Sequence, residues 1–343
     1  MSNRIFLFVL SIITLIIWSF RQTNEPTILV FEVPKKWPTP HYDFSKNPIT
    51  QEGFVLGRKL FYDPILSRDS TISCASCHLQ YTGFTHVDHN VSHGIDGRKG
   101  TRNASALINL AWNKSFHWDG GVNHIEVQGL NPIQHPAEMD NTLEEVIKRL
   151  QKSKVYPPLF EKAFGNKQIT TAKVMKALTQ FNLSLVSSNS KYDQVMRKEK
   201  GVTFSAQEKN GLSLFRKNCA MCHSEPLFTN SLFASNGLPI DTLLKDYGRY
   251  GITYNSKDSL LFKIPTLRNI EFTFPYMHDG RFKKLKEVLA FYSEGIDPKA
   301  KNLHPKLQKK LAFNENEKKD LLAFLYTLSD KEFLFNKRYS FPK

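Results

Sequence analysis

Two short stretches of the sequence place sulfur and imidazole groups at the same spacing. Residues 74–78 and residues 219–223 both read Cys-x-x-Cys-His. Two thiols at this spacing can add to the vinyl groups of a haem, and the adjacent histidine can bind its iron. A disulfide or half of a zinc site can use the same pattern. Because all 4 cysteines of the 343-residue chain lie in these two motifs, we predict two covalently bound haem c groups.

The motifs assign six residues to these haems. We expect the cysteines to attach the haems and the histidines to be the proximal iron ligands. The residues are Cys74, Cys77 and His78 for the first haem, and Cys219, Cys222 and His223 for the second.

The length and composition are those of a folded protein with room for two domains. The chain has 41% hydrophobic and 23% charged residues. Its formal net charge of +15 favours an acidic electron donor or an anionic membrane face as a partner, although spread lysines are also a simple solvated surface. There is no recognisable nucleic-acid motif, so we expect no nucleic acid partner.

The first 48 residues differ in composition from the rest. In residues 1–20, Arg4 precedes an apolar run that is slightly short for a membrane span, which predicts an export signal. Because no Ala-x-Ala site follows, an uncleaved membrane anchor remains the alternative. Both interpretations predict a periplasmic protein, either soluble or tethered. Residues 21–48 contain five prolines and predict a linker or an extended arm.

Helical spacing dominates the remainder, and no alternating strand series is convincing. In the first half of the chain, helices are predicted from about Thr50, over Ala104–Trp112, and over Leu143–Leu150 with Asn141 as its cap. The apolar stripe of Val174, Leu178, Phe181 and Leu185 predicts another helix. In the second half, helices are predicted from Ser205 into the second motif, over Lys284–Tyr292 and over Glu315–Leu328. We therefore expect a mostly α fold with two tandem cytochrome-c-like haem domains, residues 49–200 and 201–335.

Five further motifs accompany the two Cys-x-x-Cys-His sites. They are Gly-Thr-Arg-Asn at 100–103, Trp-Asp-Gly at 118–120, Gln128 through Pro132 to Pro-Ala-Glu-Met at 136–139, Pro-Thr-Leu-Arg-Asn at 265–269, and Pro-Tyr-Met-His-Asp-Gly at 275–280. With these motifs the chain resembles, from about Thr50 to Asp330, the bacterial diheme cytochrome c peroxidases and their relative MauG. MauG is the diheme enzyme that matures the cofactor of methylamine dehydrogenase.

The resemblance implies roles for several residues. The first haem would be the peroxide site and the second would transfer electrons. Glu138 would be the acid/base group, with Gln128 hydrogen bonding in the same pocket. Trp118 would bridge the haems electronically, and His278 would lie close to them. Asn103 and the carbonyls of Thr273 and Pro275 would bind an interdomain Ca²⁺. The plainer alternatives are a surface charge for Glu138 and a core aromatic for Trp118.

Two positions depart from the pattern of the peroxidases. Many of them carry a removable histidine ligand where this chain has Ile95, so we expect an open first haem that needs no reductive activation. A shifted ligand, His93, is the alternative. Where they have an axial methionine on the second haem, this chain has Tyr292, as MauG has. A phenolate ligand lowers the reduction potential. Met277 is the rival ligand, and a core role for Tyr292 stays open.

Together these features predict a diheme c-type peroxidase that reduces H2O2 to water. A small cytochrome c or cupredoxin would supply the electrons, and the family implies a homodimer. The alternatives are a MauG-like oxidase of a protein or small-molecule substrate and, from another class, a diheme electron carrier without catalysis.

Overall fold

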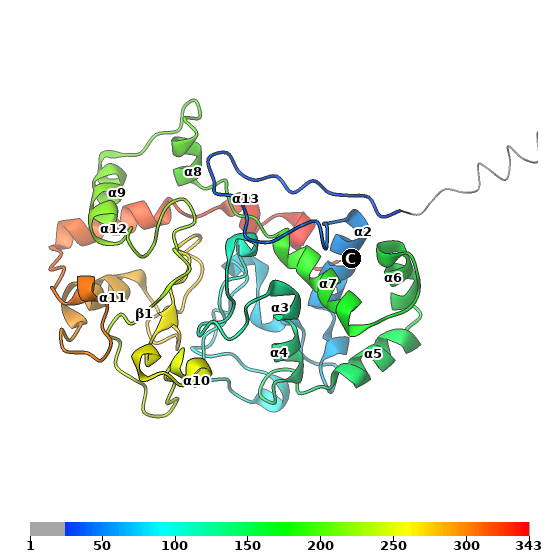
Figure 1. Ribbon diagram of the computed structural model, residues 1–343. Helices are drawn as coiled ribbons and strands as arrows, with labels where there is room; N and C mark the ends of the chain where they lie inside the picture. Colours follow the sequence, from blue (N-terminus) through cyan, green and yellow to red (C-terminus); the bar gives the residue numbers. More distant parts are fainter. Residues whose placement is uncertain (1–24, 343) are drawn as a thin grey trace, which may run out of the picture.

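The computed structural model describes residues 25–342 and is mostly helical, which confirms the expected class (Figure 1). The predicted export signal at residues 1–20 lies outside the described residues. The α-helices are α2 (Gln51–Tyr62), α3 (Cys74–Cys77), α4 (Leu130–Gln134), α5 (Leu143–Lys152), α6 (Tyr156–Phe164), α7 (Thr171–Leu183), α8 (Lys191–Met196), α9 (Ala206–Asn218), α10 (Tyr250–Thr253), α11 (Leu285–Ala290), α12 (Glu315–Tyr326) and α13 (Lys331–Leu334). No helix in this part of the chain is long and apolar enough to cross a membrane.

The regular β-structure of the described chain is one short antiparallel pair. Strand β1 (Phe233–Ala234) pairs with β2 (Phe262–Lys263), with Phe233 opposite Lys263. A single π-helical turn, Phe291–Gly295, directly follows α11. Such turns inside helices are frequent at functional sites.

Two large hydrophobic clusters organise the molecule, and each lies behind one haem motif. The first cluster extends from Ile49 to Leu185 and centres on α2 and α7. The second extends from Tyr192 to Leu328 and centres on α9 and α12. We call residues 49–191 the first half and residues 192–330 the second half. Figure 1 shows the two groups of helices side by side. Helix α13 returns to the first half, where Phe333 is buried in the first cluster.

The same helix crossing occurs in both halves. A Cβ at Gly57 of α2 would lie 2.0 Å from the Ala177 carbonyl oxygen on α7, and a Cβ at Gly211 of α9 would lie 2.0 Å from the Asp320 carbonyl oxygen on α12. Only glycine permits these backbones to approach so closely. The crossing sets the helix that leads into each haem motif directly against its partner helix.

A second repeated feature is the hairpin that contains each Asp-Gly motif. Phe116 pairs with Val122 in the first half, and Tyr276 pairs with Phe282 in the second. His117 (φ 64°) and Met277 (φ 74°) occupy the same left-handed position in the two hairpins. Trp118 and His278 are therefore structural equivalents.

Residues 25–48 form an extended arm over the first half that also reaches the second half. The carbonyl of Pro38 accepts a hydrogen bond from Trp112 Nε1 (2.7 Å). One residue earlier in the arm, the Trp37 ring lies 4.5 Å from the guanidinium carbon of Arg268. Figure 1 shows this segment crossing above α7 toward α8.

Arg268 is completely buried and joins segments that are distant in sequence. Its guanidinium donates to both Asp193 carboxylate oxygens (2.8 and 2.7 Å) and to the Pro226 and Ser187 carbonyls. Burial alone would raise the pKa of Asp193, but its bonds to Arg268 hold that pKa below the ordinary value. A buried charge pair of this kind is tolerated only when its hydrogen bonds are satisfied.

Two local predictions were wrong. Over residues 104–112 only Leu110–Trp112 is helical, as a 3₁₀ turn, because Asn109 has φ 56° and its amide bonds Leu185 instead of its own segment. Helix α5 is capped by Thr142, one residue after the predicted Asn141, whose amide instead donates to the Leu66 carbonyl.

The helix crossings give a stability prediction. Gly57→Ala or Gly211→Ala forces a methyl group against a backbone carbonyl, so each should lower the free energy of unfolding by about 1–3 kcal/mol. Thermal unfolding of the holoprotein measures the loss. Gly251→Ala in α10 is the control, since none of the described atoms lies within 4 Å of its added Cβ, and it should leave the unfolding midpoint unchanged or slightly raised. Equal midpoints for all three variants would contradict the prediction.

Candidate haem-binding sites

A cavity of the first half lies beside the first haem motif. Together with the open solvent at its mouth, it holds about 710 Å³ of space not filled by atoms. Its lining residues come from α3, α4, α7 and the loops between them. They include Cys74, Cys77, His78, His93, Gln128, Pro132, Glu138, Met175, Leu178, Thr179 and Asn182.

The first motif has the chemistry that haem attachment needs. The structure forms no disulfide between Cys74 and Cys77, and burial raises their thiol pKa values to about 12 and about 11. His78 Nδ1 lies 2.7 Å from the Phe84 carbonyl oxygen, which fixes the ring and leaves Nε2 to bind a metal. Burial lowers the pKa of His78 to about 4, so its imidazole is neutral. These features fit a covalently attached haem with His78 as its ligand.

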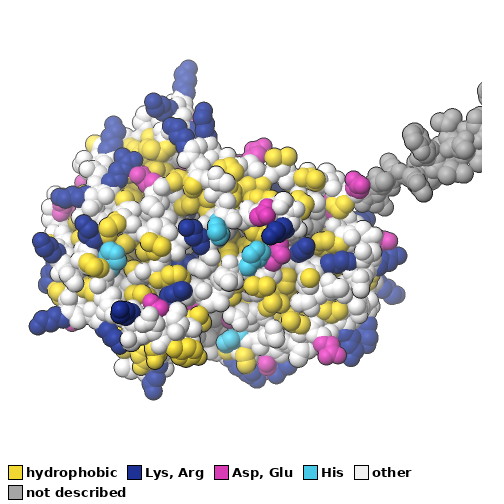
Figure 2. Space-filling model, viewed as in Figure 1, with side chains coloured by type: hydrophobic (Ala, Val, Ile, Leu, Met, Phe, Trp, Pro, Cys, Tyr) yellow, Lys and Arg dark blue, Asp and Glu magenta, His cyan; other side chains and the backbone are white. Residues whose placement is uncertain are grey.

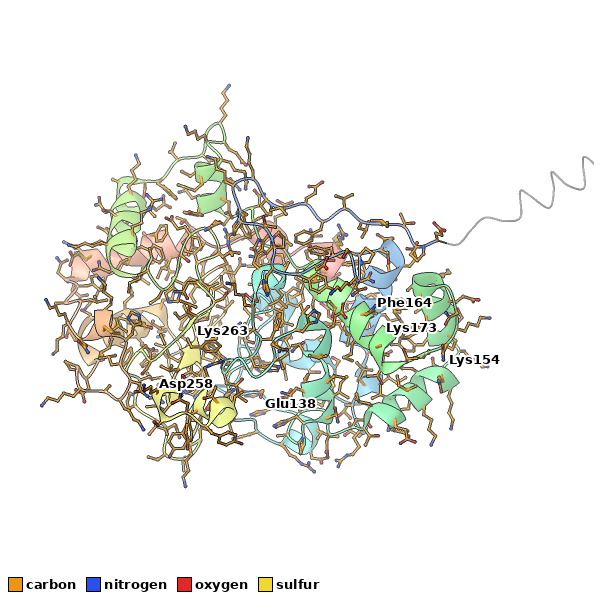
Figure 3. The ribbon with its side chains drawn as sticks, in the orientation of Figure 1. Glu138, Lys154, Phe164, Lys173, Asp258 and Lys263 are labelled. Carbon is orange, nitrogen blue, oxygen red and sulfur yellow. The ribbon has the colours of Figure 1, made fainter. Side chains whose placement is uncertain are left out.

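Glu138 and Gln128, predicted as pocket residues, both line this cavity. The loop at Gly94 and Ile95 fixes the position of the Glu138 backbone. The Ile95 amide donates to the Glu138 carbonyl (2.8 Å), and a Cβ on Gly94 would lie 2.2 Å from the Ala137 carbonyl oxygen. Burial raises the pKa of Glu138, and the nearby charge of His135 opposes this shift. The Glu138 carboxyl group thus borders the cavity with its side chain still 40% exposed, and its proton affinity is increased (Figure 3).

The position where many peroxidases carry a removable ligand is occupied by packing. Ile95 is 0% exposed and cannot ligate iron. The alternative ligand, His93, does line the cavity, and its ring stacks on His89 with ring centres 3.9 Å apart. Its carbonyl accepts a hydrogen bond from Cys77 Sγ at 3.3 Å. The structure therefore brings His93 to the cavity, whereas Ile95 belongs to the core.

Sequence analysis missed the contribution of α7 to the cavity. The predicted stripe of Val174, Leu178 and Phe181 is buried, but Leu178 also borders the cavity. Met175, Thr179 and Asn182 follow the same i, i+4, i+7 spacing on the neighbouring face. Asn182 Oδ1 is buried there and finds no hydrogen-bond partner among residues 25–342. A second stripe that mixes polar and apolar residues was the available signal.

The second haem motif has a similar environment. His223 Nδ1 lies 3.2 Å from the Phe228 carbonyl oxygen and 3.1 Å from that of Pro265, which again leaves Nε2 for a metal. Burial lowers the pKa of His223 and raises that of Cys219 to about 12. As in the first half, a neutral imidazole and a neutral thiol stand together.

Tyr292 lies in the π-helical turn and faces this second motif. Burial raises its pKa to about 12, and the neighbouring sulfurs of Cys219 and Cys222 act in the same direction. Asn236, which sequence analysis did not single out, donates its amide to the Tyr292 hydroxyl (3.2 Å) and approaches Met277 Sδ (3.5 Å). The two rival ligands, Tyr292 and Met277, thus both contact the side-chain amide of Asn236.

The remaining predicted residues meet at the boundary between the halves. Trp118 Nε1 donates to the Asn103 carbonyl (2.9 Å), and the Asn103 amide donates to the His278 carbonyl (2.6 Å). Asn103 Nδ2 donates to the Pro275 carbonyl at 2.6 Å. Burial lowers the pKa of His278, and its ring stacks on Phe262. The structure thus places Trp118, Asn103, His278 and Pro275 in one contact region between the two motifs.

The fold and the two sites define a mostly helical protein built to attach two c-type haems. A sequence profile of the di-haem cytochrome c peroxidases matches residues 51–201. The methylamine utilization protein MauG of Methylorubrum extorquens is 35% identical over 87% of this chain and 83% of its own length. The cytochrome c551 peroxidase of Nitrosomonas europaea is 33% identical over 80% of this chain and 79% of its own.

Solved structures agree with these sequence relatives. A MauG-like protein associated with microbial copper homeostasis has a TM-score of 0.81 and 31% identity, over 92% of this chain and 99% of that protein. The diheme peroxidase BthA of Burkholderia thailandensis has the same fold, with a TM-score of 0.73, 20% identity and coverage of 92% and 96%. The chain therefore belongs to the di-haem cytochrome c peroxidase and MauG family, as its motifs predicted, and two haem c groups are implied.

The raised pKa of Glu138 predicts how stability depends on pH. Between the ordinary pKa of about 4.3 and the higher folded value, the folded protein keeps a proton that the unfolded chain releases, so stability falls as pH rises. Glu138→Gln removes this loss. The variant should therefore unfold at a higher temperature than wild type at neutral pH, with the advantage disappearing near pH 4.

The matched control is Glu145→Gln on α5. Its hydrogen bond with Arg149 lowers the pKa of Glu145, so this substitution should destabilise the protein at neutral pH. Thermal unfolding midpoints across this pH range decide the point. A Glu138→Gln variant no more stable than wild type at any pH would contradict the assignment.

Proposed function

We propose that this protein is a diheme c-type peroxidase that reduces H2O2 to two water molecules with two electrons and two protons. The observation that carries the proposal is one cavity lined by Cys74, Cys77 and His78 together with Glu138 and Gln128. A bound haem would supply an iron for peroxide binding and the redox equivalents for O–O cleavage. The side chains of this protein would hold the peroxide and move its protons.

Glu138 is the proton-transfer group in this mechanism. Its carboxylate would accept a proton from one peroxide oxygen and deliver it to the other, which would then leave as water. The Gly94–Ile95 loop holds the Glu138 backbone in place through the amide of Ile95. Burial in the cavity raises the pKa of Glu138 toward the operating pH, which favours both uptake and release of the proton. Gln128 orients the substrate by hydrogen bonding.

The second half is proposed to deliver the electrons. We propose that each half is a cytochrome-c-like haem domain, which the repeated helix crossing and the repeated His–carbonyl bond support. Tyr292 would be a second protein ligand of the second haem, and Trp118 would carry electrons between the haems. A small cytochrome c or cupredoxin with an acidic surface would suit the many lysines and arginines on the surface (Figure 2).

Location and calcium belong to the same proposal. Attachment of haem to thiols and the N-terminal sequence of residues 1–20 favour the periplasm. A Ca²⁺ ion bound by the side-chain oxygen of Asn103 and the carbonyls of Thr273 and Pro275 would join the halves. Asn103 Nδ2 donates to the Pro275 carbonyl, so this contact supports the site only through the closeness of these two residues. In the described residues no group of three His, Cys, Asp or Glu could hold a metal ion, so this site would depend on neutral oxygen ligands.

A MauG-like oxidase of a protein or small molecule is the second candidate. Two observations favour it: Ile95 is buried in place of a removable ligand, and Tyr292 stands beside the second motif. Both would suit a protein that accepts peroxide in its fully oxidised state and retains the oxidising equivalents.

Glu138→Gln tests the acid/base role. Because an amide cannot carry the proton, turnover of peroxide with a reduced small cytochrome should fall by roughly two or more decades. Steady-state peroxide consumption measures it, with haem content compared by absorption. Glu145→Gln, outside the cavity, should retain wild-type turnover. Near wild-type activity of Glu138→Gln would remove this residue from the mechanism.

The buried Ile95 predicts that no reductive activation is needed. The diferric protein should react with H2O2 as fast as the half-reduced protein, since no ligand has to leave the first haem. Stopped-flow absorption of the two forms measures these rates, and electron paramagnetic resonance of the resting protein should show one high-spin iron. A strict requirement for prior reduction would be contrary to this prediction and would implicate His93.

A further inference from the structure

A lysine of the second half enters the hairpin of the first half that carries Trp118. Lys263 ends β2, and its backbone amide donates to the Trp118 carbonyl at 2.7 Å. Its Nζ donates to the Ser115 carbonyl at 3.2 Å. Figure 3 shows Lys263 where the second half meets the loops of the first. The side chain therefore lies inside the boundary between the halves and not on the outer surface.

Among residues 25–342, Lys263 has no carboxylate partner. It forms no salt bridge there, and its side chain donates only to the neutral carbonyl of Ser115. Burial lowers the pKa of Lys263 to about 8, which is the expected effect on an ammonium group without a counter-ion. Asp119, the nearest acidic residue of the hairpin, is already bound by Arg102.

His117 adds a second unused donor at the same place. Its Nε2 is buried without a hydrogen-bond partner in the described structure. The residue has φ 64°, a conformation that is uncommon for a residue with a side chain and that places it in the hairpin turn. Ser115, whose carbonyl accepts from Lys263 Nζ, lies only two residues before His117 in the chain. A buried cation and a buried imidazole nitrogen are thus both found at the hairpin that carries Trp118.

We propose that Lys263 and His117 together bind a carboxylate of the first haem. A haem attached through its vinyl groups keeps two free carboxylates, which need cationic or N–H partners when they are buried. Lys263 and His117 Nε2 offer both partners, and the hairpin at which they lie belongs to the first half, which assigns them to the first haem. Lys263 lies five residues before the arginine of the Arg268-Asn269 pair. In the first half, the residue five before the arginine of the Arg102-Asn103 pair is Gly97, so no lysine occupies the corresponding place.

This site would connect the second half to the first haem. Lys263 is part of β2 in the second half, and the haem would be covalently attached to the first half. An ion pair between Lys263 and the haem carboxylate would therefore link the two halves beside Trp118. A buried cation next to the haem also favours the reduced, less positive state of the iron, which raises the reduction potential. The inference rests on the proposed attachment of the first haem but not on peroxide chemistry, because it is tested without peroxide.

The test is a redox titration of both haems in holoprotein variants. Lys263→Met removes the charge with little change in length and should shift the ferric/ferrous equilibrium of the first haem toward ferric by roughly tenfold, a fall of about 59 mV for one electron. Lys263→Arg keeps a cation and should stay within about threefold of wild type. His117→Gly, which fits the left-handed backbone, should give a smaller fall of the same sign.

Lys257→Met is the control for long-range charge. Lys257 is exposed, so its loss should leave both potentials unchanged. Unchanged potentials in Lys263→Met and His117→Gly would overturn the proposal, and so would an equal fall in Lys257→Met. A fall confined to the second haem would overturn the assignment to the first. If Lys263→Met does not retain haem, the comparison of His117→Gly with wild type decides. Loss of peroxide turnover with normal potentials would count against the proposed function alone.

Discussion

The buried pair of Arg268 and Asp193 is the contact that fixes the second half around its haem motif and ties it to neighbouring parts of the chain. The Trp37 ring of the arm lies 4.5 Å from the guanidinium carbon. An ionised guanidinium with no exposure to water must find an acceptor for each of its donors, and Arg268 finds them on two segments, residues 187–193 and the loop after the second haem motif. That loop also carries the Phe228 carbonyl that orients His223, so the same network positions a proposed haem ligand. Its neighbour Asn269, equally buried, binds Ser187 and the Asp330 amide in the same region.

The halves share one scaffold but differ at the positions that decide chemistry. Each has a glycine at the helix crossing, a histidine held by a carbonyl six or five residues on, and an Asp-Gly hairpin. Fourteen residues after Trp118 the first half has Pro132, which lines the cavity and cannot ligate. Fourteen residues after its equivalent, His278, the second half has Tyr292. Under the proposed function, this difference would leave the first iron open to peroxide and give the second iron a ligand from Tyr292.

The boundary between the halves carries more than structural contacts. Trp118, Asn103 and His278 form one hydrogen-bonded series there, and Arg102 of the first half pairs with Asp246 of the second at 2.6 Å. Buried polar groups that are satisfied only across a boundary make the two halves depend on each other. Lys263 and His117 are the groups in this region that retain unused donor capacity, which makes them the natural partners of an anion.

The features formed by residues close together in the chain could be recognised from the sequence alone. The haem motifs, the capping box at Ser205 and Glu208, the apolar stripe of α7 and the family motifs depend on residues close together in the chain, so their spacing was sufficient. Only the tertiary structure decided which distant groups meet. The loop at Ile95 holds Glu138, Asn236 contacts both Tyr292 and Met277, and Lys263 enters the hairpin of the other half. These contacts arise from helix packing and from the pairing of buried polar groups, and neither produces a periodic pattern in the sequence.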